Sequence, residues 1–237
     1  MPKLSWIDDD ILSQAVDALL QKARSAKADA KKNFGKNVVD PFSAIFEMSG
    51  FSMDYKAWEK SEEARQAQKT LQNHVGVFHQ TILGSCTGWE NLGTGNIVDI
   101  LNKKSKIVAE IKNKHNTISG GKLSDLYYSL NEAVMQKTSI YKGYTAYYVT
   151  IIPSKSDRQD VEFTPSDNKK GSKCPSNKLI RQIDGASFYE LVTGEQNALE
   201  NLFSVLPTVI SEITGKDSLN SEKLKRLFEL AYGENED

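Results

Sequence analysis

Residues 96–114, NIVDILNKKSKIVAEIKNK, decide the fold of this 237-residue chain. β-Branched residues are frequent at both ends of the segment, so residues 96–101 and 106–114 are predicted to be strands. The polar residues 102–105 between them predict a turn. The segment is therefore expected to form an antiparallel hairpin.

Two carboxylates are expected to face each other across this hairpin. Side chains alternate between the faces of a strand, so Asp99 lies on one face of the first strand, and Glu110 and Lys112 share one face of the second. A turn centred between Lys104 and Ser105 sets Asp99 directly opposite Glu110, with Cβ atoms roughly 5 Å apart. One interpretation is a surface hairpin whose charges are solvated. The apolar neighbours of both acids in the sequence favour a central, buried strand instead.

A cation would remove the repulsion between the two carboxylates, because like charges directly opposite one another destabilise a hairpin. Mg²⁺ prefers oxygen ligands and is usually held by one or two carboxylates together with water and substrate phosphates. Asp99 and Glu110 are therefore the predicted Mg²⁺ ligands, and Lys112 adds a positive charge beside them.

A family resemblance rests on these residues. Asp99, a ten-residue gap and then Glu110-Ile111-Lys112 resemble the PD-(D/E)xK signature of metal-dependent nucleases, with Val98 where the signature has proline. The longer run VAEIKNKHNT, residues 108–117, resembles type II restriction endonucleases, in particular a subfamily that cuts GGNCC-like or GGWCC-like sites.

The resemblance implies an α/β fold, with a mixed β-sheet flanked by helices and helical elaborations at both ends. It implies Mg²⁺-dependent hydrolysis of both strands of double-stranded DNA at a short palindromic site, within a restriction–modification system. Asp99, Glu110 and Lys112 would be the catalytic residues. In this family the helix before the hairpin often adds a polar residue to the metal site, and Gln80 is the supporting candidate. Cutting a palindrome on both strands requires two active centres, so a homodimer is expected, with its interface in the N-terminal helical third or in the helices after Gly194.

Length and composition fit one globular domain. Hydrophobic residues make up 39% of the chain and charged residues 26%, which are ordinary values. The expected organisation is a helical part over 1–84, a catalytic core with its recognition loop over 85–194, and C-terminal helices over 195–237. No apolar run is long enough to span a membrane and no signal peptide is recognisable, so a cytoplasmic protein is expected.

The net charge of −1 hides two basic segments. Residues 102–122 contain six lysines and one acid, and residues 154–182 contain seven basic residues and four acids. Residues 154–178 have no sustained period and are predicted to be a long loop that contacts DNA. The predicted DNA contacts are Lys114, His115, Asn116, Arg158, Asn168, Lys169, Lys170, Lys173, Asn177 and Arg181.

Apolar periodicity and punctuating residues predict the other elements. Phe42, Ile45 and Phe46 form the apolar face of a short helix that Asp40-Pro41 begins. The remaining expectations are a helix from residue 11, a helix at 61–83, a loop at 84–95, a turn at 120–121, a helix at 123–137, a strand at 145–152, a strand–turn–helix at 179–194, and two C-terminal helices, the first kinked or split by Pro207.

Other chemistries are disfavoured. His74 and His79 lie five residues apart, which on a helix turns their rings to different faces and argues against zinc. Gly93-Thr94-Gly95 is too short for a dinucleotide fingerprint, and Gly121-Lys122 lacks the residues of a phosphate loop, so no nucleotide cofactor is expected. Two alternatives keep the same fold: a DNA repair or recombination nuclease, and a non-catalytic DNA-binding module.

Overall fold

The computed structural model describes residues 2–36, 38–93, 95–216 and 221–233. The described chain divides into two compact units. One unit is residues 17–77, and the other combines the N-terminal sixteen residues with everything from Phe78 onward. The helices α1 (Asp9–Lys32) and α3 (Tyr55–Gly84) each run from one unit into the other. The prediction of a single domain stays a prediction.

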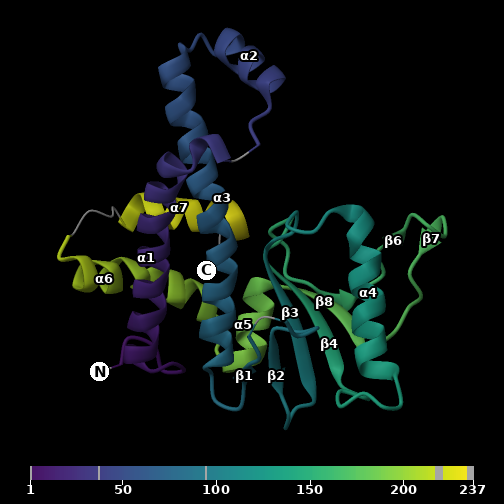
Figure 1. The fold of residues 1–237 in the computed structure, drawn as a ribbon. Coiled ribbons are helices and arrows are strands. Elements are labelled where there is room, and N and C mark those ends of the chain that lie inside the picture. Colours follow the sequence, from purple (N-terminus) through teal and green to yellow (C-terminus); the bar gives the residue numbers. More distant parts are fainter. Residues whose placement is uncertain (1, 37, 94, 217–220, 234–237) are drawn as a thin grey trace. The chain divides into compact units, whose positions relative to one another are not determined.

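A six-stranded mixed sheet is the centre of the larger unit (Figure 1). Its strand order is β1-β2-β3-β4-β8-β5. The pairs β3–β4 and β4–β8 are parallel, and the other three pairs are antiparallel. The strands are β1 (Glu90–Asn91), β2 (Ile100–Asn102), β3 (Ile107–Lys114), β4 (Thr145–Ile152), β5 (Asp160–Glu162) and β8 (Ile180–Asp184). A mixed sheet flanked by helices confirms the predicted α/β class.

The hairpin β2–β3 has the predicted register. Leu101 pairs with Val108 and Ile100 with Ala109, as a turn centred between Lys104 and Ser105 predicts. The N–H of Asp99 donates to the carbonyl of Ala109, which is already the partner of Ile100, so the backbone does not form the predicted direct pair of Asp99 with Glu110. The first strand is shorter than predicted, because β2 begins only at Ile100. Before it the chain bends, and the loop expected at 84–95 contains the edge strand β1, which pairs with β2.

Strand β3, helix α4 (Gly120–Met135) and strand β4 form the predicted parallel crossover. The helix starts three residues earlier than expected. Gly120 and Gly121 therefore lie in its first turn and do not form the separate turn that was predicted. Ser119 precedes the helix in an extended conformation, and its carbonyl accepts the N–H of Lys122 at 2.8 Å, which begins the helical hydrogen bonding at this point.

Helix α4 covers one face of the sheet, and α5 (Gly185–Thr193) packs against the other (Figure 1). On the α4 face, the strand residues Val108, Ala146 and Ile180 are completely buried. On the opposite face the rings of Tyr147 and Phe188 lie 5.8 Å apart. The sheet is therefore buried on both faces at its centre, which explains why β4 is mostly apolar and is buried at its six central positions.

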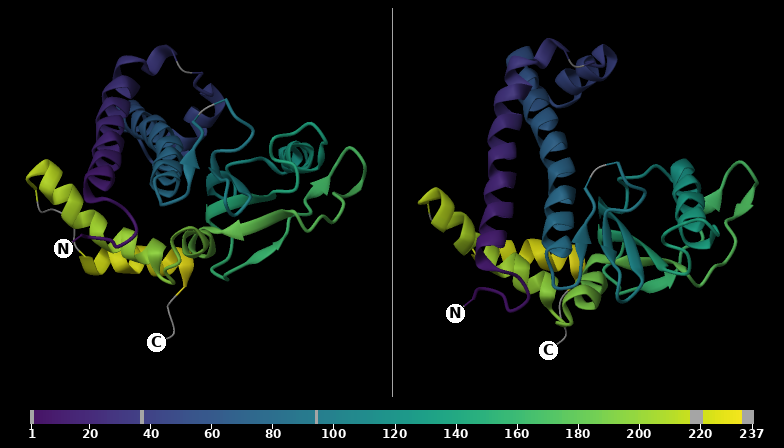
Figure 2. Two further views of the ribbon diagram at one scale, coloured as in Figure 1. Left: turned by 90° about the horizontal axis from the view of Figure 1, so that it is seen from below. Right: turned by 60° about the horizontal axis from the view of Figure 1, so that its bottom comes forward.

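The segment predicted as a long loop, residues 154–178, contains regular structure. Strand β5 pairs with β8, and β6 (Ser166–Asp167) and β7 (Ser172–Lys173) form a small hairpin of their own. Figure 2 shows this hairpin beside α4, where the hydroxyl of Tyr128 donates to the carboxylate of Asp167 at 3.0 Å. Strands of two or three residues are too short to produce a detectable alternation of side chains, so the pattern missed them.

The C-terminal part begins with the predicted strand–turn–helix, β8 followed by α5. The carboxylate of Asp184 accepts the N–H of Ser187 and caps α5, and Gly194 ends the helix with a φ of 76°. Helix α6 (Ala198–Thr214) runs through Pro207 as one helix, so Pro207 does not split it, and a kink at this residue stays a prediction. Packing offsets the proline's lost hydrogen bond, since Phe203 of α6 lies 5.2 Å from Phe228 of α7 (Ser221–Tyr232).

The unit of residues 17–77 is helical. It contains most of α1, the 3₁₀ turn η1 (Phe34–Lys36), α2 (Pro41–Gly50) and the first part of α3, which begins six residues before the predicted start. Asp40 caps α2 as expected, accepting the N–H groups of Phe42 and Ser43. The predicted apolar face of α2 points to solvent.

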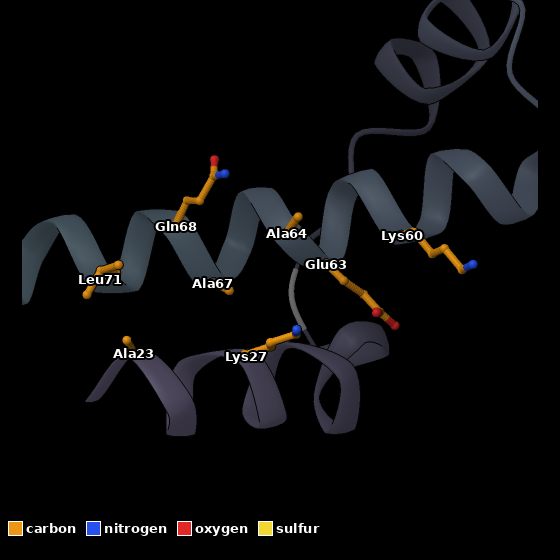
Figure 3. Close-up of a pocket in the computed structure, with 8 residues that line it drawn as sticks. All are labelled: Ala23, Lys27, Lys60, Glu63, Ala64, Ala67, Gln68 and Leu71. Atoms are coloured by element: carbon orange, nitrogen blue, oxygen red, sulfur yellow. The ribbon is translucent and has the colours of Figure 1, made fainter. Parts of the chain in front are cut away.

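A groove of about 420 Å³ lies between α1 and α3 in this helical unit (Figure 3). Alanine side chains line its floor, and Lys27, Lys60 and Glu63 lie along it. None of the predicted site residues lines the groove. No described helix is long and apolar enough to cross a membrane.

Candidate active site

Asp99 lies directly before β2 and is held by three hydrogen bonds, two to β3 and one to the residue after β1. Its backbone N–H donates to the carbonyl of Ala109 at 2.8 Å, and its own carbonyl accepts the N–H of Leu92 at 2.8 Å. The Oδ2 atom of its carboxylate accepts the N–H of Ile111 at 2.7 Å. This last bond explains the short strand, because the carboxylate takes the partner position that a preceding backbone carbonyl would occupy in a longer β2. It also fixes the carboxylate against the central strand.

Glu110 and Lys112 project from the same face of β3. The Nζ atom of Lys112 lies 2.5 Å from Oε1 of Glu110. The side chains are 15% and 25% exposed for Glu110 and Lys112, respectively, so the pair is sheltered but reachable from solvent. Both flanking residues, Ala109 and Ile111, are buried, as the central-strand interpretation requires.

The charge of Glu110 is poorly compensated despite this ion pair. Burial and then the nearby negative charge of Asp99 raise the pKa of Glu110 to about 7, and Lys112 opposes that shift only in part. Two carboxylates and one lysine therefore leave excess negative charge in a desolvated place. A cation between the carboxylates would remove that excess.

The donor set fits Mg²⁺ better than zinc. Among the described residues, no three or more His, Cys, Asp or Glu side chains gather in a metal-binding group. Two carboxylates that share their ion with water and phosphate are the usual protein contribution to a Mg²⁺ site. His79 belongs to the core, where its Nδ1 lies 2.8 Å from the hydroxyl of Tyr189 and burial lowers its pKa to about 4.

Three predicted DNA contacts follow Lys112 at the carboxyl end of β3. Lys114 is half-buried, and His115 and Asn116 are exposed. The backbone N–H of His115 donates to the carbonyl of Ile152, which ties this turn to β4. Gln80 lies half-buried on α3, and its predicted place at the metal site stays a prediction.

Two predicted DNA contacts are engaged with acids of the chain. Arg158 donates to the hydroxyl of Ser187 at 2.8 Å and to the carboxylate of Glu190 at 2.5 Å. Arg181 donates to the carboxylate and the carbonyl of Asp160, at 2.6 and 2.8 Å. Both guanidinium groups therefore fix neighbouring parts of the fold.

The other predicted contacts surround the β6–β7 hairpin. The ammonium of Lys169 lies 3.0 Å from the carboxylate of Asp125, and that of Lys170 lies 4.5 Å from the centre of the Tyr128 ring. Asn177 turns inward, donating to the side chain of Asn131 at 3.2 Å and accepting the N–H of Leu179 at 3.0 Å. Asn168 and Lys173 are exposed, and within the part of the chain that the structure describes neither forms an ion pair.

The sequence analysis did not single out two polar residues that the structure brings to this face. Tyr148 and Thr150 of β4 pair with Glu110 and Lys112 of β3, and both are buried. The available signal was the presence of hydroxyl groups at alternate positions of a strand that is otherwise apolar.

Known proteins are similar in sequence to this chain over most of its length. A family model described as Eco47II restriction endonuclease matches residues 4–215. The type II restriction enzyme Eco47II of Escherichia coli is 49% identical over 240 residues, which cover 98% of this chain and 100% of that protein. The type II restriction enzyme Sau96I of Staphylococcus aureus is 30% identical over 213 residues, which cover 88% of this chain and 80% of that protein.

The chain is therefore a type II restriction endonuclease, which confirms the resemblance seen in the sequence. It belongs to the Eco47II restriction endonuclease family.

Proposed function

We propose that the chain hydrolyses phosphodiester bonds in both strands of double-stranded DNA at a short palindromic site, with Mg²⁺ held by Asp99 and Glu110 on a PD-(D/E)xK core. The observation that carries this proposal is the raised pKa of Glu110, about 7, beside Asp99 on the central hairpin. A folded protein that keeps two half-buried carboxylates close together, with only one lysine beside them, is suited to a divalent cation. Membership of a restriction endonuclease family supports the same conclusion.

Each residue has a definite task in this mechanism. Mg²⁺, when bound, polarises the scissile phosphate and lowers the pKa of a bound water. Asp99 offers its Oδ1 atom from a fixed position, because Oδ2 is bonded to the N–H of Ile111. Glu110 supplies a carboxylate from the opposite strand. Lys112 orients the attacking water and stabilises the negative charge that develops on the phosphate oxygens.

The proposed target is a GGNCC-like or GGWCC-like sequence, in accordance with the resemblance of residues 108–117. Guanine offers O6 and N7 in the major groove to lysine and arginine, and adenine pairs with asparagine. Lys173 and Asn168, at the β6–β7 hairpin, are exposed and fit base readout. Lys114, His115 and Asn116 are proposed to contact DNA next to the cleavage site.

The proposed working unit is a homodimer located in the cytoplasm. A palindrome presents the same chemical groups twice, related by a two-fold axis, so two copies of the chain match it. Helix α2 offers an apolar surface for such an association, since Phe42, Ile45 and Phe46 are 74%, 58% and 75% exposed.

The direct test is cleavage of sequenced plasmid DNA with and without Mg²⁺. Discrete fragments whose ends map to one short sequence are expected, with no cutting in EDTA, and Glu110→Gln serves as the inactive control. Cutting at branched or damaged DNA without sequence preference would point to a repair or recombination nuclease. Binding without cutting, by the wild-type protein in Mg²⁺, would point to a non-catalytic DNA-binding module.

A further inference from the structure

Strand β4 carries two buried hydroxyl groups that lack a hydrogen-bond partner among the described residues. Tyr148 is 2% exposed and Thr150 is 1% exposed, and neither the Tyr148 Oη nor the Thr150 Oγ1 atom bonds to any described group. Leaving a buried polar group unsatisfied costs about 1–3 kcal/mol. Such groups in a folded protein call for a specific explanation.

Other buried or half-buried tyrosines of the same unit show the ordinary arrangement. The hydroxyl of Tyr127 donates to the carbonyl of Pro175 at 2.7 Å, and that of Tyr232 donates to the carbonyl of Ile151 at 3.0 Å. Tyr189 is bonded to His79. The fold therefore satisfies tyrosine hydroxyls where they only contribute to packing, and Tyr148 departs from this pattern.

Both unsatisfied hydroxyls belong to the catalytic face of the sheet. In the parallel register of β3 and β4, Glu110 pairs with Tyr148, and Lys112 pairs with Thr150. Paired residues of neighbouring strands share a face, so each hydroxyl-bearing side chain stands beside one member of the Glu110–Lys112 ion pair.

The Glu110–Lys112 ion pair suggests a role for Thr150 as a hydrogen-bond acceptor. In this structure Lys112 donates to Glu110 at 2.5 Å. A cation that occupies Glu110 competes for this carboxylate, and the ammonium group, with three N–H donors, then needs another acceptor. The Thr150 hydroxyl is the unsatisfied acceptor in register with it.

We propose that Tyr148 and Thr150 are positioning residues of the active site. The Tyr148 hydroxyl donates to a water molecule that Glu110 holds together with the metal, and the Thr150 hydroxyl accepts a hydrogen bond from Lys112. This inference rests on the proposed function. Groups that orient the ligands of a metal typically change metal affinity or activity by about 10–100-fold when they are removed.

The test compares Tyr148→Phe with Tyr147→Phe. Tyr147 is the next residue of β4, points to the opposite face and has its hydroxyl 3.4 Å from Asp160, so its variant removes the same atom away from the site. Three quantities are measured: Mg²⁺ affinity by calorimetry without DNA, single-turnover cleavage rate, and affinity for cognate DNA in Ca²⁺.

For Tyr148→Phe, the cleavage rate and Mg²⁺ affinity are expected to fall by about 10-fold or more, with DNA affinity and the thermal midpoint of the metal-free protein unchanged. Loss of an unsatisfied hydroxyl removes no bond from the metal-free fold. Tyr147→Phe should retain wild-type Mg²⁺ affinity and cleavage rate. A Tyr148→Phe enzyme with wild-type Mg²⁺ affinity and cleavage rate would overturn the role of Tyr148.

Thr150 is tested by Thr150→Val and its rescue by Thr150→Ser. The valine variant preserves shape without the hydroxyl and should slow cleavage by about 10-fold, whereas the serine variant should cut like the wild type. Equal cleavage rates for Thr150→Val and Thr150→Ser would exclude a role of the Thr150 hydroxyl in cleavage. If the wild-type protein neither binds Mg²⁺ nor cuts DNA, the proposed function is wrong and this inference is wrong with it. If the wild type is active and the variants behave like it, only this inference is wrong.

Discussion

The backbone N–H of Ile111 donates to the carboxylate of Asp99 at 2.7 Å, so the side chain that ends a strand is also the one proposed as a metal ligand. The two roles use different oxygen atoms of the same carboxylate. They also depend on different properties, because the bond to Ile111 needs only an acceptor, whereas metal binding needs negative charge.

The first prediction separates these roles at Asp99. Asp99→Asn keeps an acceptor for Ile111 and loses the charge, so it should fold with a wild-type thermal midpoint while cleavage falls by orders of magnitude. Asp99→Ala loses both and should also be destabilised by about 1 kcal/mol or more, because the buried N–H loses its partner. Cleavage by Asp99→Asn at the wild-type rate would show that cleavage does not need the negative charge of Asp99.

The second prediction concerns pH and Glu110. Its pKa is raised by burial and by Asp99, from 4.5 to about 7, so the folded state favours the protonated carboxyl. The unfolded chain loses this proton near pH 4.5 and the folded chain near pH 7. The metal-free protein is therefore expected to be most stable below pH 4.5 with respect to this group, and to lose about 1–3 kcal/mol as pH rises through 7.

Unfolding by urea in EDTA, at pH 5 and pH 8, measures this loss. Glu110→Gln removes the titrating group and should flatten the difference between the two pH values, while Glu63→Gln on α3 is the control that should not. Mg²⁺ should recover stability mainly at pH 8, because it binds the deprotonated carboxylate. A pH dependence that is identical in Glu110→Gln and in the wild type would assign the effect to other groups.

The third prediction divides the basic residues of the segment 154–182. Lys173→Ala should weaken cognate DNA binding, because its ammonium is exposed and forms no ion pair within the described chain. Arg158→Ala should mainly lower the thermal midpoint, since its guanidinium joins Ser187 and Glu190. A base contact should cost about 1–3 kcal/mol at one position of the site, whereas a phosphate contact should weaken all sequences alike and reduce the salt dependence.

Binding assays on cognate and singly substituted duplexes, at several salt concentrations, distinguish these cases. If Lys173→Ala changes neither specificity nor salt dependence while Arg158→Ala changes both, the hairpin is not the recognition element, and the ion pairs of Arg158 open when DNA binds.

The strands that carry the chemistry could be predicted because their pattern is strong. The turn centre and the pairing of β2 with β3 could be predicted from the alternation of side chains along the two strands. The central position of the hairpin could be predicted from the apolar residues on either side of Asp99 and Glu110. The N-terminal boundary of β2 could not be predicted. The Asp99 carboxylate takes the place of a backbone acceptor there, and strand propensities do not include such side-chain hydrogen bonds. Likewise, Pro207 predicts a break, but the packing of α6 on α7 offsets its cost.

The roles of the basic residues depend on tertiary partners. Arg158 and Lys173 look alike in the sequence and both are exposed, and only the fold shows that Arg158 donates to the carboxylate of Glu190. Tyr148 and Thr150 were missed for the same reason, since a hydroxyl in a strand signals a site only when its lack of a partner is visible.

The last prediction concerns the homodimer and the surface that forms it. Phe42 and Phe46 of α2 are 74% and 75% exposed, and Phe51 and Tyr55 next to them in the chain are 68% and 60% exposed. Aromatic side chains bury about 150–250 Å² each, so this surface could supply several hundred of the roughly 800 Å² that each partner contributes to a standard interface. Phe46→Asp should therefore dissociate the dimer in analytical ultracentrifugation, and the monomer should nick plasmid DNA in preference to linearising it. Leu230→Asp, which places the same charge at a 76% exposed position of α7, is the matched control and should stay dimeric. Dissociation by Leu230→Asp alone would move the interface to the C-terminal helices. A wild-type protein that is monomeric, with and without cognate duplex, would contradict the dimer itself.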